Sequence, residues 1–353
     1  MKIALVNDSL LQGRGADQVV FELAKRLGRK HKIDVVTTET DFPEKNFRIK
    51  RVKTQRLLTG DWRDFLFFKT VGQFRHTIQK GNYDLINLHH ATLAPAFLGM
   101  KNVVITYHGS PFEMLGEKGL RKFLRYLANK GGLFCLRYFP KIVAVSYYLK
   151  KELIKNRVPQ QKIEVIYNGA SPEFFPTNQD ENFMFFVGRH VPHKRIDQLI
   201  QLSRKVNFPL KVAGSGPETE KLKNLTKKLA APVEFLGDLP KNQLIKYYQS
   251  CSFFVSASLW EGFGLIFLEA ARCAKPAVAY STGSIPELIK HKKTGFIASN
   301  PCEFEKYVKL LIEDKGERKR MGKEALKESQ KFDWDETTRK YLDLFKEITE
   351  NKH

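Results

Sequence analysis

The chain has 353 residues, enough for two domains of ordinary size, and a composition without low-complexity tracts that predicts a soluble globular protein. Its four cysteines lack a C-x-x-C spacing and no apolar run is long enough to cross a bilayer, which argues against a disulfide scaffold or a membrane-spanning protein and predicts a cytoplasmic one. The net charge is +22, of which residues 1–170 carry +16 (30 basic against 14 acidic side chains), and this favours an anionic partner such as nucleic acid, a membrane surface or a phosphorylated acceptor.

Strand and helix patterns alternate along the first half of the chain. Short apolar runs bounded by turn residues predict strands, and longer runs with apolar side chains on one face predict helices. The predicted strands are 2–8, 33–37, 47–52, 84–89, 102–108, 141–146 and 162–167. The predicted helices are 19–30, 61–80, 92–98, 119–136 and 147–155. This alternation predicts a parallel sheet covered by helices.

The segment 168–182 carries turn formers and prolines without periodicity, so it predicts a linker between two domains. The same alternation then restarts. The predicted strands are 183–188, 210–216, 233–237 and 252–258, and the predicted helices are 196–206, 218–230, 241–249, 303–313, 317–330 and 334–349. Two doubly wound α/β domains are the simplest architecture that fits this order.

The stretch 259–297 holds the strongest sign of a ligand site. A strand runs into a glycine loop, and a helix is predicted to begin near Gly264 or Leu265. Glycines at such a turn let the backbone approach a ligand, and the N–H groups at a helix N-terminus favour phosphate. Glu261 and Glu269, eight positions apart, are predicted to share a face and to bind hydroxyl groups of one ligand. In isolation, such a pair of glutamates would more often simply be solvated.

Further polar loops follow other predicted strands of the second half. Arg189 and Lys194 stand in the loop GRHVPHKRID, where two cations could neutralise a diphosphate, although in so basic a chain such a pair is more often a surface feature. The turns GSG (214–216) and LGDLP (236–240) could line the same ligand or could simply be favourable turn chemistry. Ligands of doubly wound sheets bind at the C-terminal ends of the strands, so these loops are predicted to meet there.

These motifs, with QGRGADQVVFELAKRL near the N-terminus and VIYNGASPEFF between the halves, resemble the retaining glycosyltransferases of family 4, which have the GT-B fold. The resemblance covers nearly the whole chain, and its motifs are specific in combination. It implies two Rossmann-like doubly wound domains facing a cleft. Residues 1–170 would form the acceptor-side domain and 171–331 the nucleotide-sugar-binding domain, with a C-terminal helix (332–353) that returns to the first domain.

The resemblance also assigns roles to single residues. His108 and Glu261 would be catalytic, although a strand-end histidine is also a plausible structural residue. The donor diphosphate would be bound by Gly13, Arg14, Gly15, Arg189, Lys194, Phe263, Gly264 and Leu265, and the nucleoside by Gly214, Leu239 and Glu269. No metal or cofactor is expected, and Asp333 of the segment DWD is predicted to cap the last helix.

The resemblance therefore predicts a metal-independent retaining hexosyltransferase of polysaccharide or glycolipid biosynthesis. It would move a sugar from a UDP- or GDP-linked donor to a hydroxyl group of a glycan or a lipid-linked acceptor. A nucleotide-sugar epimerase or a phosphorylase with the GT-B fold is the alternative. A nucleic-acid-binding protein that uses the basic first half is a further alternative, but it leaves the loop between Glu261 and Glu269 unexplained.

Residues 61–80 and 118–139 combine Lys and Arg with aromatic side chains at helical spacing. Such stretches suit docking on an anionic bilayer, and hence a lipid-linked acceptor and a peripheral position on the cytoplasmic face of the membrane. In the alternative arrangement the aromatic side chains face the core and the cations face water. The sequence does not decide between the two.

Overall fold

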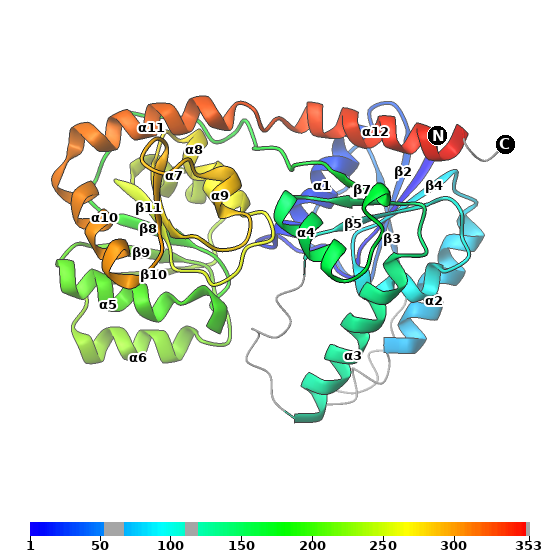
Figure 1. Ribbon diagram of the computed structural model, residues 1–353, viewed down its shortest axis with the longest axis horizontal. Helices are drawn as coiled ribbons and strands as arrows, with labels where there is room; N and C mark the ends of the chain where they lie inside the picture. The colour runs from blue at the N-terminus through cyan, green and yellow to red at the C-terminus, as the bar shows by residue number, and fades with distance from the viewer. Residues whose placement is uncertain (53–66, 110–118, 351–353) are drawn as a thin grey trace. The chain divides into compact units, whose positions relative to one another are not determined.

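The computed structural model describes residues 1–52, 67–109 and 119–350, and it divides into two compact units (Figure 1). Unit 1 comprises the described residues up to Asn168 together with the chain from Trp334 onward, and unit 2 comprises Gly169–Asp333. Each unit is an α/β structure built on a parallel sheet. The predicted fold class is confirmed.

The described part of unit 1 contains a seven-stranded sheet whose strands are all parallel. They are β1 (Lys2–Val6), β2 (Lys32–Thr37), β3 (Arg48–Arg51), β4 (Leu85–Leu88), β5 (Val103–Tyr107), β6 (Lys141–Ala144) and β7 (Ile163–Val165). Their order in the sheet is β3-β2-β1-β4-β5-β6-β7, so the winding direction reverses between β1 and β4. The central strands are buried on both faces, which explains their nearly continuous apolar sequences.

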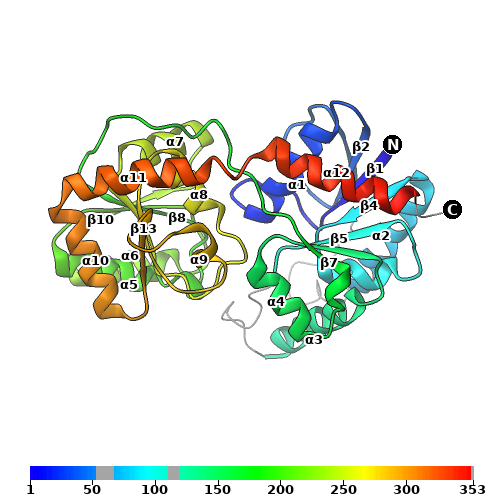
Figure 2. The same cartoon turned by 45° about the horizontal axis from the view of Figure 1, so that its top comes forward.

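The strand order decides which helices of unit 1 share a face of the sheet. The helical elements are α1 (Gly15–Leu27), α2 (Phe67–Gly81), the 3₁₀ helix η2 (Ala91–Phe97), α3 (Gly119–Leu136), α4 (Tyr147–Lys155), the 3₁₀ turn η4 (Gln160–Lys162) and α12 (Trp334–Glu350). The steps β4→β5→β6→β7 run one way across the sheet and β1→β2 runs the other way. Because crossovers between parallel strands are right-handed, η2, α3 and α4 cover one face and α1 covers the other. The helix α12 lies along α1 (Figures 1 and 2).

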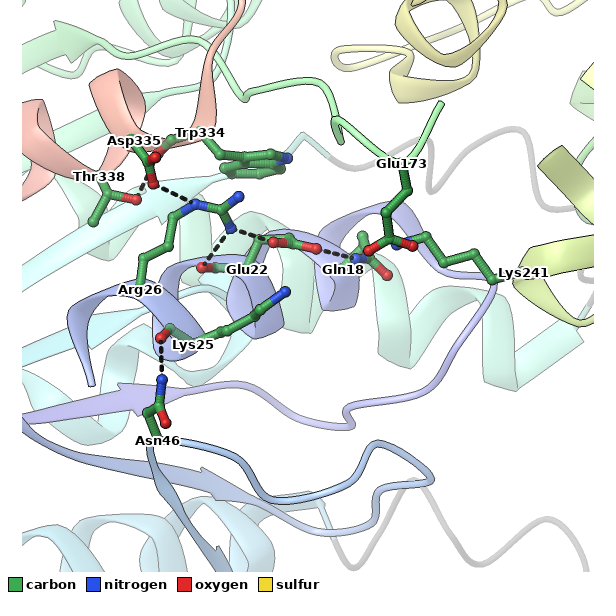
Figure 3. Close-up of polar contacts among 10 residues, drawn as sticks. All are labelled: Gln18, Glu22, Lys25, Arg26, Asn46, Glu173, Lys241, Trp334, Asp335 and Thr338. Atoms are coloured by element: carbon green, nitrogen blue, oxygen red, sulfur yellow. Dashed lines mark hydrogen bonds and ion pairs between the residues drawn. The ribbon is translucent and has the colours of Figure 1, made fainter. Parts of the chain in front are cut away.

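Arg26 joins α12 to α1 (Figure 3). Its guanidinium donates to the buried carboxylate of Glu22 one turn earlier in α1, and its Nε donates to Asp335 Oδ1 at 2.9 Å. The same guanidinium lies 5.7 Å from the ring centroid of the buried Trp334. The arginine therefore ties the first turn of the C-terminal helix to the last turn of the first helix of the chain.

Replacement of Arg26 by alanine is expected to destabilise unit 1 by about 3 kcal/mol, because the carboxylate of Glu22 would stay buried without its cation. Asp335→Ala is the matched control: its side chain is 72% exposed, so this change should cost less than about 1 kcal/mol. Urea unfolding followed by circular dichroism measures both. Equal midpoints for the two variants would show that the Arg26 contact does not hold α12 in place.

The described part of unit 2 contains a six-stranded parallel sheet in the order β10-β9-β8-β11-β12-β13. Its strands are β8 (Met184–Val187), β9 (Leu210–Ala213), β10 (Val233–Gly237), β11 (Phe253–Ser256), β12 (Ala277–Tyr280) and β13 (Gly295–Ala298). Its helices are η5 (Pro192–Lys194), α5 (Ile196–Val206), α6 (Thr219–Leu229), α7 (Lys241–Ser250), α8 (Leu265–Arg272), α9 (Ile285–Leu288), α10 (Pro301–Glu313) and α11 (Lys315–Ser329). The helices α5 and α6 lie side by side (Figure 1). The winding direction reverses between β8 and β11.

Most predicted elements lie within a few residues of the observed ones, and the exceptions have local reasons. The first helix begins at Gly15 rather than at residue 19, because Arg14 is extended and serves as its N-cap, and it ends before Gly28. The strands β12 and β13 were missed, since apolar runs of four residues are too short to show a period. In the predicted helix 61–80, residues 61–66 lie outside the described residues, and Phe74 and Ile78 are buried in the core.

Candidate active site

Unit 2 brings two of the predicted site residues into direct contact at the reversal point of its sheet. Lys194 ends the turn η5 in the loop that follows β8, and Glu261 lies in the loop that follows β11. Lys194 Nζ donates to Glu261 Oε1 at 2.5 Å, and the exposed fractions of the two side chains are 14% and 9%. The strands β8 and β11 are neighbours at the place where ligands of doubly wound sheets bind. The contact therefore puts a cation and a carboxylate together at the expected ligand position of this unit.

The backbone around Glu261 is held by two neighbouring segments, the loop of His193 and the turn of Gly283 and Ser284. Leu259 N–H donates to the carbonyl oxygen of His193 at 2.8 Å, which joins the loop of Glu261 to the loop of Lys194. Ser284 N–H donates to the carbonyl oxygen of Glu261 at 3.0 Å from the turn before α9. Gly283 approaches so closely that an added Cβ would lie 2.2 Å from that oxygen. These contacts hold the backbone of Glu261 in place beside the loop of Lys194.

Glu261 and Glu269 do not share a helix face, contrary to the prediction. The helix α8 begins at Leu265, so Glu269 lies in its second turn and Glu261 precedes it. Gly264 lies between them as the N-cap of α8, with φ +84°. Glycine adopts this left-handed conformation without strain, and it keeps the helix from extending back to Glu261. The predicted start of the helix is confirmed. Its first N–H groups, at Leu265 and beyond, follow this turn, whereas the side chain of Phe263 is buried against Phe332.

Glu269 is half-buried, and its carboxylate is held by a side chain of α7. The hydroxyl of Tyr248 donates to Glu269 Oε2 at 2.9 Å, and the tyrosine side chain is completely buried. Burial raises the pKa of the Glu269 carboxyl, and the hydrogen bond from Tyr248 opposes this increase. Tyr248 was not predicted as a site residue, because it belongs to an amphipathic helix without a motif.

The glycine turns of unit 2 pack against one another at the C-terminal ends of β8, β9 and β10. Gly214 has φ +102°, its N–H donates to the carbonyl oxygen of Gly237 at 2.7 Å, and an added Cβ would lie 2.2 Å from the carbonyl oxygen of Gly188. This close backbone approach by itself explains why residue 214 is a glycine, and no contact with a ligand is needed to explain it. Leu239 is half-buried in the adjacent turn, and Arg189, unlike Lys194, is exposed.

In unit 1 the loop Gly13–Gly15 leads from β1 into α1. Gly13 has φ +77°, Arg14 donates through Nη1 to the hydroxyl of Ser9 at 2.7 Å, and Gly15 is the first residue of the helix. Asp17 anchors this loop, since its carboxylate accepts hydrogen bonds of 2.8 Å from Asn7 Nδ2 and from Leu11 N–H. Burial raises the pKa of Asp17 to about 6. The sequence offered one signal for Asp17, its place directly after the glycine loop.

His108 follows β5 and pairs with His89, which follows the neighbouring strand β4. His89 Nδ1 lies 3.0 Å from His108 Nε2, and the two rings stack with their centroids 5.3 Å apart. Burial lowers the pKa of His108 to about 3 and that of His89 well below its ordinary value, so both imidazoles are neutral at pH 7. This pair lies at the C-terminal ends of β4 and β5, next to the reversal point between β1 and β4. His108 is therefore suited to neutral hydrogen bonding rather than to binding a phosphate through charge.

Among residues 1–52, 67–109 and 119–350, no group of three His, Cys, Asp or Glu side chains is placed to hold a metal ion. Within the same ranges, no helix is both long enough and apolar enough to cross a bilayer.

Two family descriptions match the chain. Residues 170–328 match the model of the glycosyl transferases group 1, and residues 13–174 match that of Glycosyltransferase Family 4. An uncharacterized glycosyltransferase of Methanocaldococcus jannaschii is 30% identical over 288 residues, which cover 78% of this chain and 79% of that protein. The chain belongs to this family of glycosyltransferases, and its activity is sugar transfer from a nucleotide-sugar.

Solved structures share the fold at lower sequence identity. Sucrose-phosphate synthase from Thermosynechococcus elongatus has a TM-score of 0.85 and 19% identity, covering 99% of this chain and 100% of that one. The HepE protein of Anabaena, solved in complex with UDP and glucose, has a TM-score of 0.78 and 19% identity, covering 98% and 100%. The two parallel-sheet units thus form the GT-B fold.

Proposed function

We propose that this protein is a retaining, metal-independent hexosyltransferase that moves a sugar from a UDP- or GDP-linked donor to a hydroxyl group of a glycan or a lipid-linked acceptor. The observation that supports the donor half of this proposal is the pair Lys194–Glu261 at the reversal point of the unit 2 sheet. A cation bound to the loop that precedes α8 suits a diphosphate, and a carboxylate next to that cation suits a sugar hydroxyl.

Lys194 and Glu261 can act on the same donor at once. An ammonium group has three N–H donors, so Lys194 can keep its bond to Glu261 while it binds a phosphate oxygen. Negative charge grows on the diphosphate as the sugar leaves, and a preorganised cation stabilises that charge. Glu261 would orient the cation and bind the transferred sugar, so that the anomeric carbon stays in place.

The remaining roles follow from position. Glu269, supported by Tyr248, would accept the ribose hydroxyl groups. Arg189 would add a second charge to the diphosphate with the N–H groups around Gly264 and Leu265, and Leu239 would line the nucleoside. The acceptor hydroxyl would attack from the side on which the diphosphate departs, and the diphosphate would take its proton. The roles of Gly13, Arg14, Gly15 and His108 in unit 1 stay predictions, as does the absence of a metal.

A panel of nucleotide-sugars tests this function. We expect one or a few UDP- or GDP-sugars to raise the melting temperature and to be hydrolysed slowly without an acceptor, in the presence of EDTA as well as in its absence. Product analysis must then show a released nucleoside diphosphate and a sugar of retained anomeric configuration. Release of an isomerised nucleotide-sugar would indicate an epimerase, and release of a sugar phosphate a phosphorylase.

A further inference from the structure

Exposed large apolar side chains concentrate on the helices α3 and α4 of unit 1 and on the turn that follows α3. Among the described residues eight such side chains are exposed, and six of them fall between residues 126 and 154, with exposed fractions from 37% to 61%. These six are Tyr126, Leu127, Phe134, Tyr138, Tyr147 and Ile154. Scattered exposed apolar residues are ordinary, but a concentration of this kind marks an interaction surface.

The outward side of the described part of α3, residues 126–136, is largely apolar. Tyr126, Lys130 and Phe134 succeed one another at intervals of four residues and are all exposed, with Leu127 beside them. Leu133 and Leu136 on the other side of the helix are buried. An ordinary surface helix has one apolar stripe, which faces the core, and charged residues on its outer side. The described part of α3 has a second, largely apolar stripe that faces solvent and contains Lys130.

Cations lie directly against the exposed rings. Lys130 Nζ is 5.5 Å from the ring centroid of Tyr126, and the guanidinium of Arg137 is 4.0 Å from that of Phe134. On α4 the exposed Lys151 and Lys155 accompany Tyr147 and Ile154. Both helices thus combine aromatic rings, aliphatic groups and positive charge on their outward sides.

The two helices present these side chains from the same face of the sheet. The connections β5→α3→β6 and β6→α4→β7 step in one direction across the sheet, and right-handed crossovers then put both helices on one side. Figure 2 shows α3 and α4 together on the side of the sheet opposite α1 and α12. The two outward sides are therefore parts of a single side of unit 1.

The charge of this region is almost entirely positive. Residues 119–157 contain ten Lys and Arg residues and one acidic residue, Glu152. The carboxylate of Glu152 accepts a hydrogen bond from the buried Tyr107 hydroxyl, so it is turned toward the protein. An anionic partner would meet no acidic side chain of residues 119–157 other than this one.

We infer that the α3–α4 surface, defined as the six apolar side chains above with Lys130, Lys151 and Lys155, docks on an anionic lipid bilayer. A bilayer interface accepts aromatic and aliphatic groups below the headgroups while lysines bind the anionic headgroups. Nucleic acid would use the rings and cations but has no place for the aliphatic Leu127 and Ile154. The inference rests on the proposed function and extends it, because a chain docked on a bilayer would find its acceptor in that membrane. Docking requires no donor, so it can fail or succeed independently of the proposed sugar transfer.

The test is sedimentation of the full chain with vesicles, without nucleotide. The wild type should bind vesicles of phosphatidylcholine with phosphatidylglycerol, more weakly as salt rises and weakly to phosphatidylcholine alone. The charge variant Lys130→Glu, Lys151→Glu, Lys155→Glu should bind at least about 100-fold more weakly, since each lost cation near an anionic surface costs about five-fold and the added carboxylates are repelled. The apolar variant Leu127→Ser, Phe134→Ser, Ile154→Ser should also lose binding, at low salt as well as at high salt.

The matched control is Lys227→Glu, Lys228→Glu, Lys246→Glu, three exposed lysines of α6 and α7 in unit 2. It changes the net charge by the same amount and should bind vesicles like the wild type. If the control and the charge variant lose vesicle binding equally, then net charge alone explains the loss, and the inference is overturned. Unchanged vesicle binding by the apolar variant would also overturn it. So would a wild-type chain that binds single-stranded RNA in gel-shift experiments but does not bind vesicles. Thermal unfolding of each variant checks that it is folded.

Discussion

Replacement of Lys194 by methionine should lower kcat/KM more than 100-fold, mainly through kcat, which corresponds to a loss of about 3 kcal/mol of transition-state stabilisation. The change removes the charge that faces the leaving diphosphate but keeps the apolar stem. Glu261→Gln should raise the free-energy barrier of the kcat step by about 2 kcal/mol, because it removes the charge of the group that orients Lys194 and the sugar. The double variant should lose less than the sum, with a coupling of at least about 1 kcal/mol, since each single change already breaks the same ion pair.

Steady-state kinetics on the two single variants and the double variant measure this coupling directly. Lys205→Met is the matched control, because Lys205 forms a similar ion pair with Glu305 at 2.6 Å on the surface of α5 and α10. It should leave kcat and KM unchanged. Strictly additive losses at Lys194 and Glu261 would mean that the two side chains act separately and that their contact has no role in the reaction.

The sequence predicted elements best where several local signals agreed. The helix α4 was predicted at its observed bounds, since Ser146 is an N-cap whose side chain accepts from Leu149 N–H and its apolar side chains repeat with helical spacing. The helices α3 and α5 were also predicted at their observed bounds. The short strands β12 and β13 carry no such signal, and the sheet supplies their conformation through pairing with neighbours.

The contacts of the site could not be predicted in the same way. Lys194 and Glu261 are 67 positions apart, and they meet because β8 and β11 are neighbours in the sheet although β9 and β10 lie between them in the chain. Strand order is a tertiary property that local patterns do not encode. The contact between Tyr248 and Glu269 depends in the same way on how α7 and α8 pack. The sequence named the residue types of the site, and the topology determined their partners.

The basic stretches show the same division between local pattern and packing. Residues 61–80 and 118–139 had similar composition, yet Phe74 and Ile78 of the first face the core while Tyr126 and Phe134 of the second face solvent. Lys118 lies outside the described residues. Only the packing of each helix on the sheet separates a core-facing aromatic residue from an exposed one. The exposed apolar residues of α4 were missed, because Tyr147 and Ile154 are unremarkable in an amphipathic helix.

The two glutamates should respond in opposite directions when nucleoside diphosphate binding is measured by isothermal titration. Glu269→Gln should weaken binding by about 10- to 100-fold, because the carboxylate that accepts the ribose hydroxyl groups loses its charge. The glutamine can still accept from Tyr248, so the packing between α7 and α8 should survive. Tyr248→Phe, which removes the hydrogen bond that orients the carboxylate, should weaken binding by less.

Glu261→Gln should bind nucleoside diphosphate at least as tightly as the wild type. It removes a negative charge 2.5 Å from the ammonium of Lys194 and leaves that cation more available to the phosphates. Binding of the intact nucleotide-sugar should gain less or even weaken, since Glu261 is proposed to hold the sugar. If Glu261→Gln loses the nucleoside diphosphate as badly as Glu269→Gln does, then both carboxylates bind the nucleotide and the proposed division between sugar and ribose is wrong.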